Sequence, residues 1–278
     1  MTPLEFFAAA FAIALAAGLL GSLLGLGGGI IVIPALTLLL GVDIRYAIGA
    51  SIVAVIATSS GAAAAYVRER MTNLRVAMFL EIATTTGALT GAYLSGVIGV
   101  RWLYIVFGVV MSYSAVAMYR KRHDSLVAQA RPSGLADRLG LHASYYDEAT
   151  KRELAYRVAR PGAGLGLMYV AGAVSGLLGI GSGALKVPAM DLAMRLPIKV
   201  STATSNFMIG VTAAASAGVY FARGDINPFI AAPVAAGVLG GATAGSRLLG
   251  RIDSGAIRTV FVVVLLWVSL EMLLKGVR

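Results

Sequence analysis

The chain has 278 residues, of which 58% are hydrophobic and 13% are charged, and its mean hydropathy is +0.84. An average soluble domain carries about 25% charged residues, so this composition excludes an ordinary soluble protein and indicates an integral membrane protein. The net charge of +10 fits basic loops that orient a membrane protein, and we predict no nucleic-acid partner. Without cysteine and with only two histidines, the chain predicts no metal site and no cofactor.

Eight apolar stretches are each near the roughly 20 residues that a helix needs to cross a bilayer. In chain order they are 4–24, 46–66, 76–100, 102–119, 162–180, 200–222, 228–246 and 256–274. Two shorter apolar runs, 29–41 and 184–194, each follow a cluster of glycines and are too short to cross alone. We therefore predict an all-α polytopic membrane protein.

The chain repeats itself when the numbering is shifted by 154 residues, and the register holds over roughly 90 residues. The paired residues include Gly25 and Gly179, Gly29 and Gly183, Pro34 and Pro188, Ser51 and Ser205, Thr58 and Thr212, Asn73 and Asn227, and Gly87 and Gly241. The repeat predicts two homologous transmembrane halves, 1–119 and 162–278, each with a glycine-broken helical hairpin and three transmembrane helices. Such halves are typical of secondary transporters with a site between them.

Residues 120–161 are the clearly hydrophilic stretch and contain nine Lys or Arg residues. We predict a basic linker loop here, with a short helix around 148–158. No catalytic signature is visible in it.

The basic residues favour halves of opposite orientation. If 4–41 is a helix, a break and a short return helix, 17 of the 23 basic residues share one side. Drawing 4–41 as one crossing gives parallel repeats and a weaker split of 15 to 7. Because basic loops stay in the cytoplasm, we predict inverted repeats in a bacterial-type plasma (inner) membrane, with both termini outside and the linker cytoplasmic.

Two glycine clusters, Gly25–Gly29 and Gly179–Gly183, interrupt apolar segments. Each glycine inside a helix lowers the stability of that helix by about 1 kcal/mol relative to alanine, so both clusters predict breaks. Within a bilayer, unwound backbone is tolerated only where it is buried or lines a cavity, and it exposes amide donors beside a new helix N-terminus. We expect an anion to bind at Gly27, Gly28, Gly29, Gly181, Ser182 and Gly183. The alternative is that these glycines are merely flexible or allow close packing.

Lys186 lies three residues after the second cluster, deep in an apolar segment, where the first half has Val32. A charged group at this depth is costly, so an intramembrane lysine is a functional candidate, here as the cation for one anionic substrate. The alternatives are a lysine that reaches back to the membrane surface or one that pairs with Asp191.

Hydroxyl and amide groups open the span that begins near residue 200. Thr204, Ser205 and Asn206, with the repeat-related Ser51, offer neutral donors that suit an oxyanion which must be released again. Alternatively, the serines and threonines hydrogen-bond neighbouring helices.

Glu81 is the acidic residue well inside the later spans of the first half, and three threonines follow it one turn on. It could relay coupling protons, or it could pair with Arg75 near the membrane surface.

Four segments, GLLGSLLGLGGGIIVIPAL, AIGASIVAV, GLLGIGSGALKVPAM and STATSNF, occur in this order. Together they resemble the sulfite exporter TauE/SafE family of permeases, also called the four-toluene sulfonate uptake permease family. The resemblance covers nearly the whole chain. It implies transport of a small sulfur-containing anion, either sulfite or an organosulfonate.

We therefore expect a secondary transporter that uses alternating access at a site between the repeats. No G-x4-GK[ST] loop is present, so an ion gradient or the substrate gradient must supply the energy. The alternatives are a passive anion channel or a carrier of a non-sulfur organic anion, and no enzyme is predicted. The expected partners are the substrate anion, the lipid bilayer and a coupling proton or other ion. The sequence predicts no oligomeric state.

Overall fold

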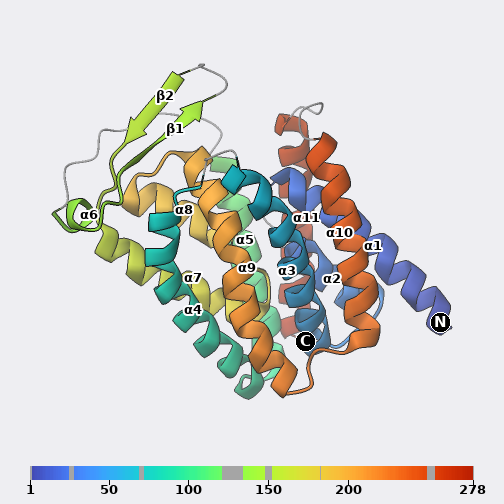
Figure 1. Ribbon diagram of the computed structural model, residues 1–278. Coiled ribbons are helices and arrows are strands. Elements are labelled where there is room, and N and C mark those ends of the chain that lie inside the picture. Colours follow the sequence, from blue (N-terminus) through green and yellow to red (C-terminus); the bar gives the residue numbers. More distant parts are fainter. Residues whose placement is uncertain are drawn as a thin grey trace.

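The computed structural model describes residues 2–24, 28–68, 72–120, 134–147, 152–181, 183–248 and 254–277. These residues form a helical bundle with a small two-stranded sheet at one end (Figure 1). The helices are α1 (Pro3–Leu24), α2 (Gly29–Leu39), α3 (Ile44–Arg68), α4 (Leu74–Val97), α5 (Val100–Arg120), α6 (Gly134–Arg138), α7 (Pro161–Leu178), α8 (Gly183–Met194), α9 (Ile198–Ala222), α10 (Pro228–Leu248) and α11 (Ser254–Val277). The strands are β1 (Ala143–Asp147) and β2 (Arg152–Tyr156).

The helices follow the ten apolar stretches that the sequence marked, so the mostly helical fold is confirmed. Three described helices contain segments long and apolar enough to cross a membrane, namely Pro3–Gly21, Pro161–Leu178 and Pro228–Gly245. Helices α4 and α9 are more polar because α4 carries Glu81 with its threonines and α9 carries the run Ser201–Asn206. The polar residues in these two helices need partners inside the protein.

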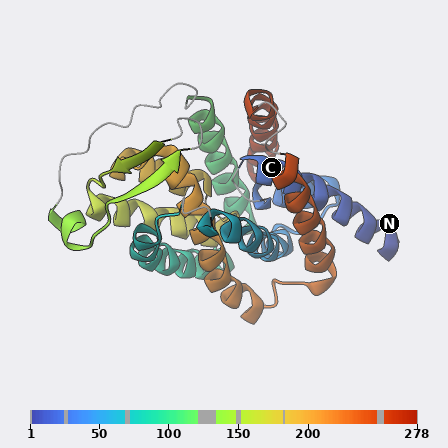
Figure 2. The ribbon, with the colours of Figure 1, turned by 45° about the horizontal axis from the view of Figure 1, so that its top comes forward.

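The linker departs from the all-α prediction, because β1 and β2 pair as an antiparallel hairpin. The short helix expected around 148–158 is therefore wrong for Arg152–Tyr156. Packing explains the difference: the rings of Tyr145 and Tyr156 lie 6.3 Å apart and are buried with Leu141 in an apolar cluster. These tertiary contacts outweigh the helix propensity of the sequence RELAY. In Figure 2 the hairpin and α6 lie beside α7 and α8, away from α1.

Glycines bring the long helices into close contact. Helix α1 packs along α10 and α4 packs along α7, while α3 crosses α9 and α5 pairs with α11. A Cβ atom added at Gly18 would lie 2.7 Å from the Cα of Val238, and one added at Gly172 would lie 2.8 Å from the Cα of Thr84. Such small residues let helix backbones approach where water drives no association.

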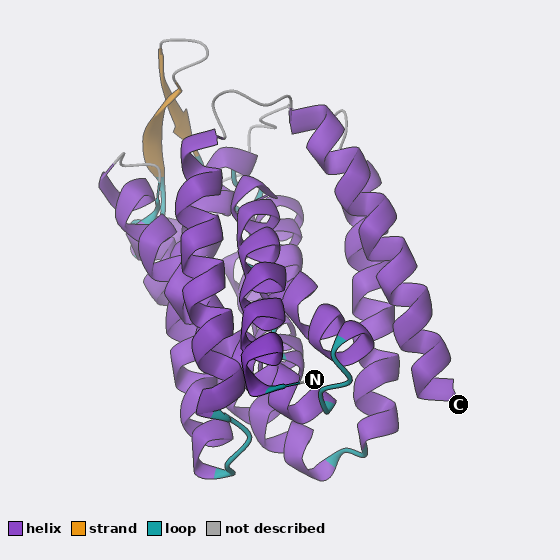
Figure 3. Cartoon of the chain, turned by 90° about the vertical axis from the view of Figure 1, so that its right-hand side faces the viewer, coloured by secondary structure: helices purple, strands orange, loops and turns teal. Residues whose placement is uncertain are grey.

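The bundle has two distinct ends, which Figure 3 shows with the hairpin at one and the C-terminus towards the other. At the linker end, the backbone N–H of Ala159 donates to the carbonyl of Met194 at 3.0 Å, which joins the start of α7 to the end of α8. At the opposite end, Lys275 Nζ donates to the carbonyl of Thr37 at 2.9 Å, which joins the ends of α2 and α11. The rings of Phe6 and Phe229 stack at 5.8 Å and join the start of α1 to the start of α10.

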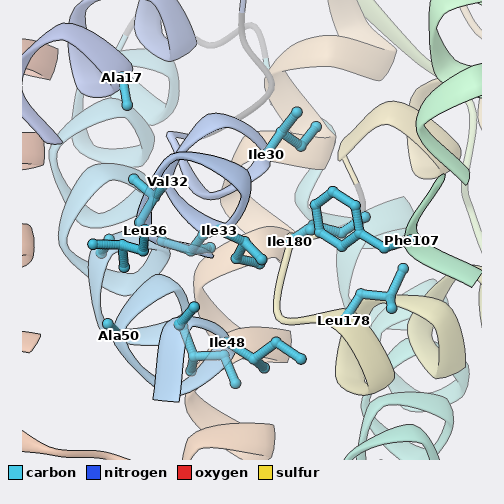
Figure 4. Close-up of a cluster of buried hydrophobic side chains, with 14 of the residues drawn as sticks. Ala17, Ile30, Val32, Ile33, Leu36, Ile48, Ala50, Phe107, Leu178 and Ile180 are labelled. Atoms are coloured by element: carbon cyan, nitrogen blue, oxygen red, sulfur yellow. The ribbon is translucent and has the colours of Figure 1, made fainter. Parts of the chain in front are cut away.

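Helix α2 is enclosed on most sides by apolar side chains. Figure 4 shows Ile30 and Ile33 of α2 near Ile180, which lies in the second glycine cluster, with Ile48 of α3 and Phe107 of α5 nearby. These five residues are at most 1% exposed. The short helix is therefore held in the core, where its N-terminus faces protein.

We predict that Gly176→Ala lowers the apparent melting temperature of the purified protein, because the new methyl group would overlap the carbonyl oxygen of Ala88 on α4. Overpacking of this kind costs about 1–3 kcal/mol. The matched control is Gly166→Ala on the same helix, where nothing lies within 4 Å of the added Cβ. That variant should melt at the wild-type temperature or above it, and equal losses in both variants would contradict the close α4–α7 contact.

Candidate anion site between the glycine breaks

The described parts of the two glycine breaks, Gly28–Gly29 and Gly179–Gly181, meet in the buried interior of the bundle. A Cβ added at Gly29 would lie 2.5 Å from Ser51 Oγ and 3.3 Å from the carbonyl oxygen of Gly179. Ser51 Oγ donates to that same carbonyl at 2.8 Å, so a hydroxyl on α3 binds the second break beside the start of α2. Residues 128 positions apart in the sequence thus form one junction.

The second break lies against the crossing of α3 and α9. Gly179 and Gly181 adopt the left-handed backbone conformation, with φ of +66° and +74°. An added Cβ at Gly181 would lie 2.8 Å from Val55 Cγ1 and 3.0 Å from Ile209 Cγ2. Glycine is required here for both reasons, because other residues resist positive φ and no side chain fits.

The first break ends in a helix N-terminus without a side-chain cap. Gly28 is the residue before α2 and has no side chain that could accept a hydrogen bond from the first N–H groups of the helix. Its carbonyl accepts from the N–H groups of Ile31 and Val32, both at 3.2 Å. Gly28 and Gly29 are buried. The first N–H groups of a helix lack partners within the helix, so this N-terminus can accept an anion.

Two predicted glycine-cluster contacts, Gly27 and Ser182, lie outside the described residues. Gly183 begins α8 and is buried, so it places a second helix start in the interior.

Lys186 on α8 is fully buried, with 0% of its surface exposed. Its ammonium group donates to Thr212 Oγ1 on α9 at 2.6 Å. This burial excludes the alternative in which the lysine reaches back to the membrane surface. A buried ammonium must be compensated by an opposite charge or by hydrogen bonds.

Glu81 on α4 supplies that compensation through the same threonine. Thr212 Oγ1 lies 2.7 Å from Glu81 Oε1, which also accepts from Thr85 Oγ1 at 3.1 Å. The second carboxylate oxygen, Oε2, is buried and has no hydrogen-bond partner among the described residues. Arg75, the partner that the sequence offered as an alternative, donates instead to the carbonyl of Gly140 at 3.0 Å.

A polar stripe runs along one face of α9. Ser201, Ser205 and Thr212 are spaced by four and seven residues, which places them on the same side of a helix. All three are fully buried, and the hydroxyls of Ser201 and Ser205 have no hydrogen-bond partner within the described part of the chain. Unsatisfied buried hydroxyls are costly, and a bound polar ligand would satisfy them.

The neighbouring polar residues of α9 have different surroundings. Thr204 Oγ1 accepts a hydrogen bond from the backbone N–H of Asn73 at 3.1 Å, so its hydroxyl faces the start of α4. Asn206 is 6% exposed and lies one position from Ser205 on an adjacent side of the helix. Among the predicted α9 residues, Ser205 thus shares its face with Thr212.

The linker hairpin closes over the end of the bundle where α4 and α9 begin. Asn73 Nδ2 donates to Tyr156 Oη at 2.8 Å and to the carbonyl of Leu141 at 3.0 Å. Burial raises the pKa of Tyr156 to about 12, although the hydrogen bond from Asn73 acts in the opposite direction. The tyrosine hydroxyl therefore stays neutral at physiological pH, and its bond to Asn73 fastens the linker to the start of α4, the helix that carries Glu81.

The opposite end is fastened by Arg223, which follows α9. Its guanidinium donates to the carbonyl of Ala92 at 2.6 Å and to Ser95 Oγ at 2.9 Å, both on α4. Its Nε pairs with Asp225 Oδ2 at 2.7 Å, and its Cζ lies 4.6 Å from the ring centre of Tyr220. The buried polar groups are therefore bounded by a polar contact network at each end of the bundle.

Sequence reasoning marked Lys186, Glu81, Ser51 and the breaks but missed the role of Thr212, noted only as the repeat partner of Thr58. The spacing of Ser201, Ser205 and Thr212 places the threonine on the polar face of α9, but its bonds to Lys186 and Glu81 depend on how the helices pack. Thr58 itself hydrogen-bonds only to the carbonyls of Ala54 and Val55 on its own helix, among the described residues. The link from Lys186 to Glu81 therefore has no counterpart at Val32.

The family profile described as "Sulfite exporter TauE/SafE" matches residues 10–272. The chain belongs to this family. It is a membrane transporter of the TauE/SafE family, as the motifs in the sequence indicated, and its apolar helices fit a membrane protein.

Curated relatives of this TauE/SafE protein carry transporter names. A protein from Bacillus subtilis (strain 168) named "Probable membrane transporter protein YunE" is 28% identical over 271 residues, which cover 95% of this chain and 96% of the relative. A "Probable membrane transporter protein" from Xylella fastidiosa (strain 9a5c) is 27% identical over 91% of this chain and 93% of its own length. No solved structure matches the chain. These names indicate a transporter and not an enzyme.

Proposed function

We propose that this TauE/SafE protein is a secondary transporter for a small sulfur-containing anion, sulfite or an organosulfonate. The observation that carries the proposal is the fully buried Lys186 beside two converging glycine breaks. A buried cation, uncapped helix N–H groups and unpartnered serine hydroxyls together suit an oxyanion with several acceptor oxygens.

The substrate would lie between the two halves of the chain. Lys186 Nζ would neutralise its charge, and Ser205 Oγ would donate to an oxygen atom. Ser51 already spans the junction by its bond to Gly179, so it would hold the breaks in place and join the ligand contacts when that bond opens. Amide donors from the breaks, which include Gly28 and Gly29, would complete the site.

Transport would proceed by alternating access. At the linker end the bond between Asn73 and Thr204 joins α4 to α9, and at the opposite end Arg223 joins α9 to Ala92 and Ser95 of α4. Breaking one network while the other holds would open the site to one side at a time. The presence of a network at both ends favours a carrier over a passive channel, which needs a continuous path.

The proposed architecture is a pair of inverted repeats, 1–119 and 162–278. Support comes from contacts that recur at the 154-residue shift: Gly18 meets Val238 as Gly172 meets Thr84. In the hairpin α1–α2, the start of α1 and the end of α2 both lie at the side of the bundle away from the linker. In the hairpin α7–α8, the start of α7 and the end of α8 both lie at the linker side. One half would then be upside down relative to the other.

Cysteine labelling tests the proposed orientation in a bacterial plasma membrane, because the chain has no cysteine of its own. Gly134 in the linker and Gly99 at the opposite end have no atom within 4 Å of an added Cβ, so both tolerate substitution. We expect Gly99→Cys to react with a membrane-impermeant thiol reagent on intact cells. Gly134→Cys should react only after permeabilisation, and the reverse pattern would refute the cytoplasmic linker.

A thermal-shift screen tests the substrate class. Purified protein should melt at higher temperature with sulfite or alkyl sulfonates than with carboxylates of equal size, because a ligand that binds the folded state stabilises it. Stabilisation by carboxylates alone would instead favour a carrier of non-sulfur organic anions.

Glu81 is proposed as the residue that couples transport to protons. It is a carboxylate between helices with one unpartnered oxygen, linked by Thr212 to the lysine that would hold the substrate. Glu81→Gln should make transport independent of pH while retaining substrate binding.

A further inference from the structure

Three side chains from three helices form a buried chain of hydrogen bonds. Lys186 Nζ lies 2.6 Å from Thr212 Oγ1, which lies 2.7 Å from Glu81 Oε1. Lys186 and Thr212 are fully buried, and Glu81 Oε2 is buried without a partner in the described segments. One positive and one negative charge are therefore joined by a single neutral hydroxyl.

The Thr212 hydroxyl carries only one hydrogen atom, so it can donate to one acceptor at a time. Two acceptors are within reach, Glu81 Oε1 at 2.7 Å and the carbonyl of Met208 at 2.8 Å. Lys186 donates to the same oxygen atom in either orientation. A charged carboxylate attracts the hydroxyl hydrogen to Glu81, whereas a protonated Glu81 leaves it free to turn to Met208.

We propose that the transporter binds one proton at Glu81 together with each singly charged anion at Lys186, and that Thr212 links the two events. This inference rests on the proposed function of the site. In the empty site Glu81 acts as the counter-ion of Lys186. A bound anion takes over that role, and the carboxylate would then be a second, uncompensated negative charge in the interior.

Protonation at the unpartnered Oε2 removes that excess charge. The occupied site then holds the ammonium and one anion, with the same net charge as the empty site. A buried uncompensated charge is strongly unfavourable, so anion and proton should bind cooperatively. The same reasoning selects a monovalent sulfonate, because a dianion would need a second proton and Glu81 Oε2 is the one buried carboxylate oxygen without a partner in the described segments.

The charged and titratable groups near the hydrogen bonds of Lys186, Thr212 and Glu81 determine whether another residue could take the proton. On the elements around Glu81 they are Arg75 and Tyr93 on α4 itself, Tyr169 on α7, Lys186 and Asp191 on α8, and Lys199 and Tyr220 on α9. Of these, Lys186 shares a hydrogen-bond partner with Glu81 and interacts with it electrostatically.

Calorimetric titration with methanesulfonate tests the inference, because the charge of this anion does not change near neutral pH. Repeating the titration in buffers of different ionisation enthalpy measures the number of protons taken up per anion bound. We expect about one proton per anion for the wild type, and an affinity that rises about tenfold for each unit of decrease in pH. Glu81→Gln should bind with no proton uptake and with little dependence on pH.

Thr212→Val removes the hydroxyl but keeps the shape, and it should reduce the proton uptake and flatten the pH dependence. Thr212→Ser restores the hydroxyl and should restore both. The matched control is Thr58→Val, the repeat-related threonine, whose hydroxyl bonds only to its own helix within the described residues. This control should behave as the wild type, which separates loss of the link from general damage to the fold.

The outcomes separate the two proposals. Binding without proton uptake, or uptake that Glu81→Gln leaves unchanged, would overturn the coupling while the transported anion class stands. An affinity that falls at lower pH would also overturn it, because proton and anion would then compete. Failure of methanesulfonate and of every sulfur anion in the thermal-shift screen to bind at any pH would overturn the proposed function and this inference together.

Discussion

Lys186→Met is expected to weaken sulfonate binding about 10- to 150-fold. A hydrogen bond to a charged group contributes about 1.5–3 kcal/mol, and about 1.4 kcal/mol corresponds to a factor of ten. Lys186→Arg should recover binding only in part, because a planar guanidinium replaces a compact ammonium in a fully buried position. Equilibrium binding to the purified variants measures both effects.

Loss of the lysine alone also leaves Glu81 without its counter-charge, which destabilises the fold by about 3–5 kcal/mol in buried pairs. The double variant Lys186→Met with Glu81→Gln removes both charges and should regain stability but not sulfonate binding. Lys275→Met is a control for loss of charge elsewhere, since this lysine bonds to Thr37 at the opposite end. Wild-type affinity in the double variant would show that Lys186 does not contact the anion.

Gly181→Ala is expected to lower sulfonate affinity at least about tenfold and to destabilise the protein. The residue has φ of +74°, where a residue other than glycine costs about 1–2 kcal/mol. Its new methyl group would also lie 2.8 Å from Val55 and 3.0 Å from Ile209, so the break must shift away from the crossing of α3 and α9. Binding and melting temperature are measured on the same preparation.

Gly224→Ala separates these two effects. Gly224 has a similar φ of +78°, but nothing lies within 4 Å of an added Cβ. This control should lose stability through backbone strain and keep its affinity. If Gly181→Ala loses no more affinity than Gly224→Ala, the second break does not shape the anion site.

The positions of the long helices could be predicted because apolar length and the 154-residue repeat are local or periodic signals. Lys186 was predictable for the same reason, since one charge in an apolar run stands out. The link through Thr212 was not, because it joins α9 to Glu81 across 131 residues and to α8 across 26. No spacing rule connects side chains on different helices before their packing is known.

In the linker, local sequence propensity predicts the wrong secondary structure. The segment Arg152–Tyr156 contains residues that favour helix, yet it pairs with β1 and packs Tyr156 against Tyr145. Asn73, which precedes α4 and lies 83 residues away, donates to Tyr156 and adds a tertiary contact to that packing. A local propensity could not anticipate that contact.

Counterflow in proteoliposomes tests most directly whether a sulfur anion is carried through the Lys186 site. Vesicles loaded with an unlabelled alkyl sulfonate should transiently accumulate the labelled sulfonate from outside when they contain the wild type. Vesicles that contain the folded double variant of Lys186→Met with Glu81→Gln should not. No accumulation with the wild type, or equal accumulation with the double variant, would contradict a sulfonate carrier centred on this lysine.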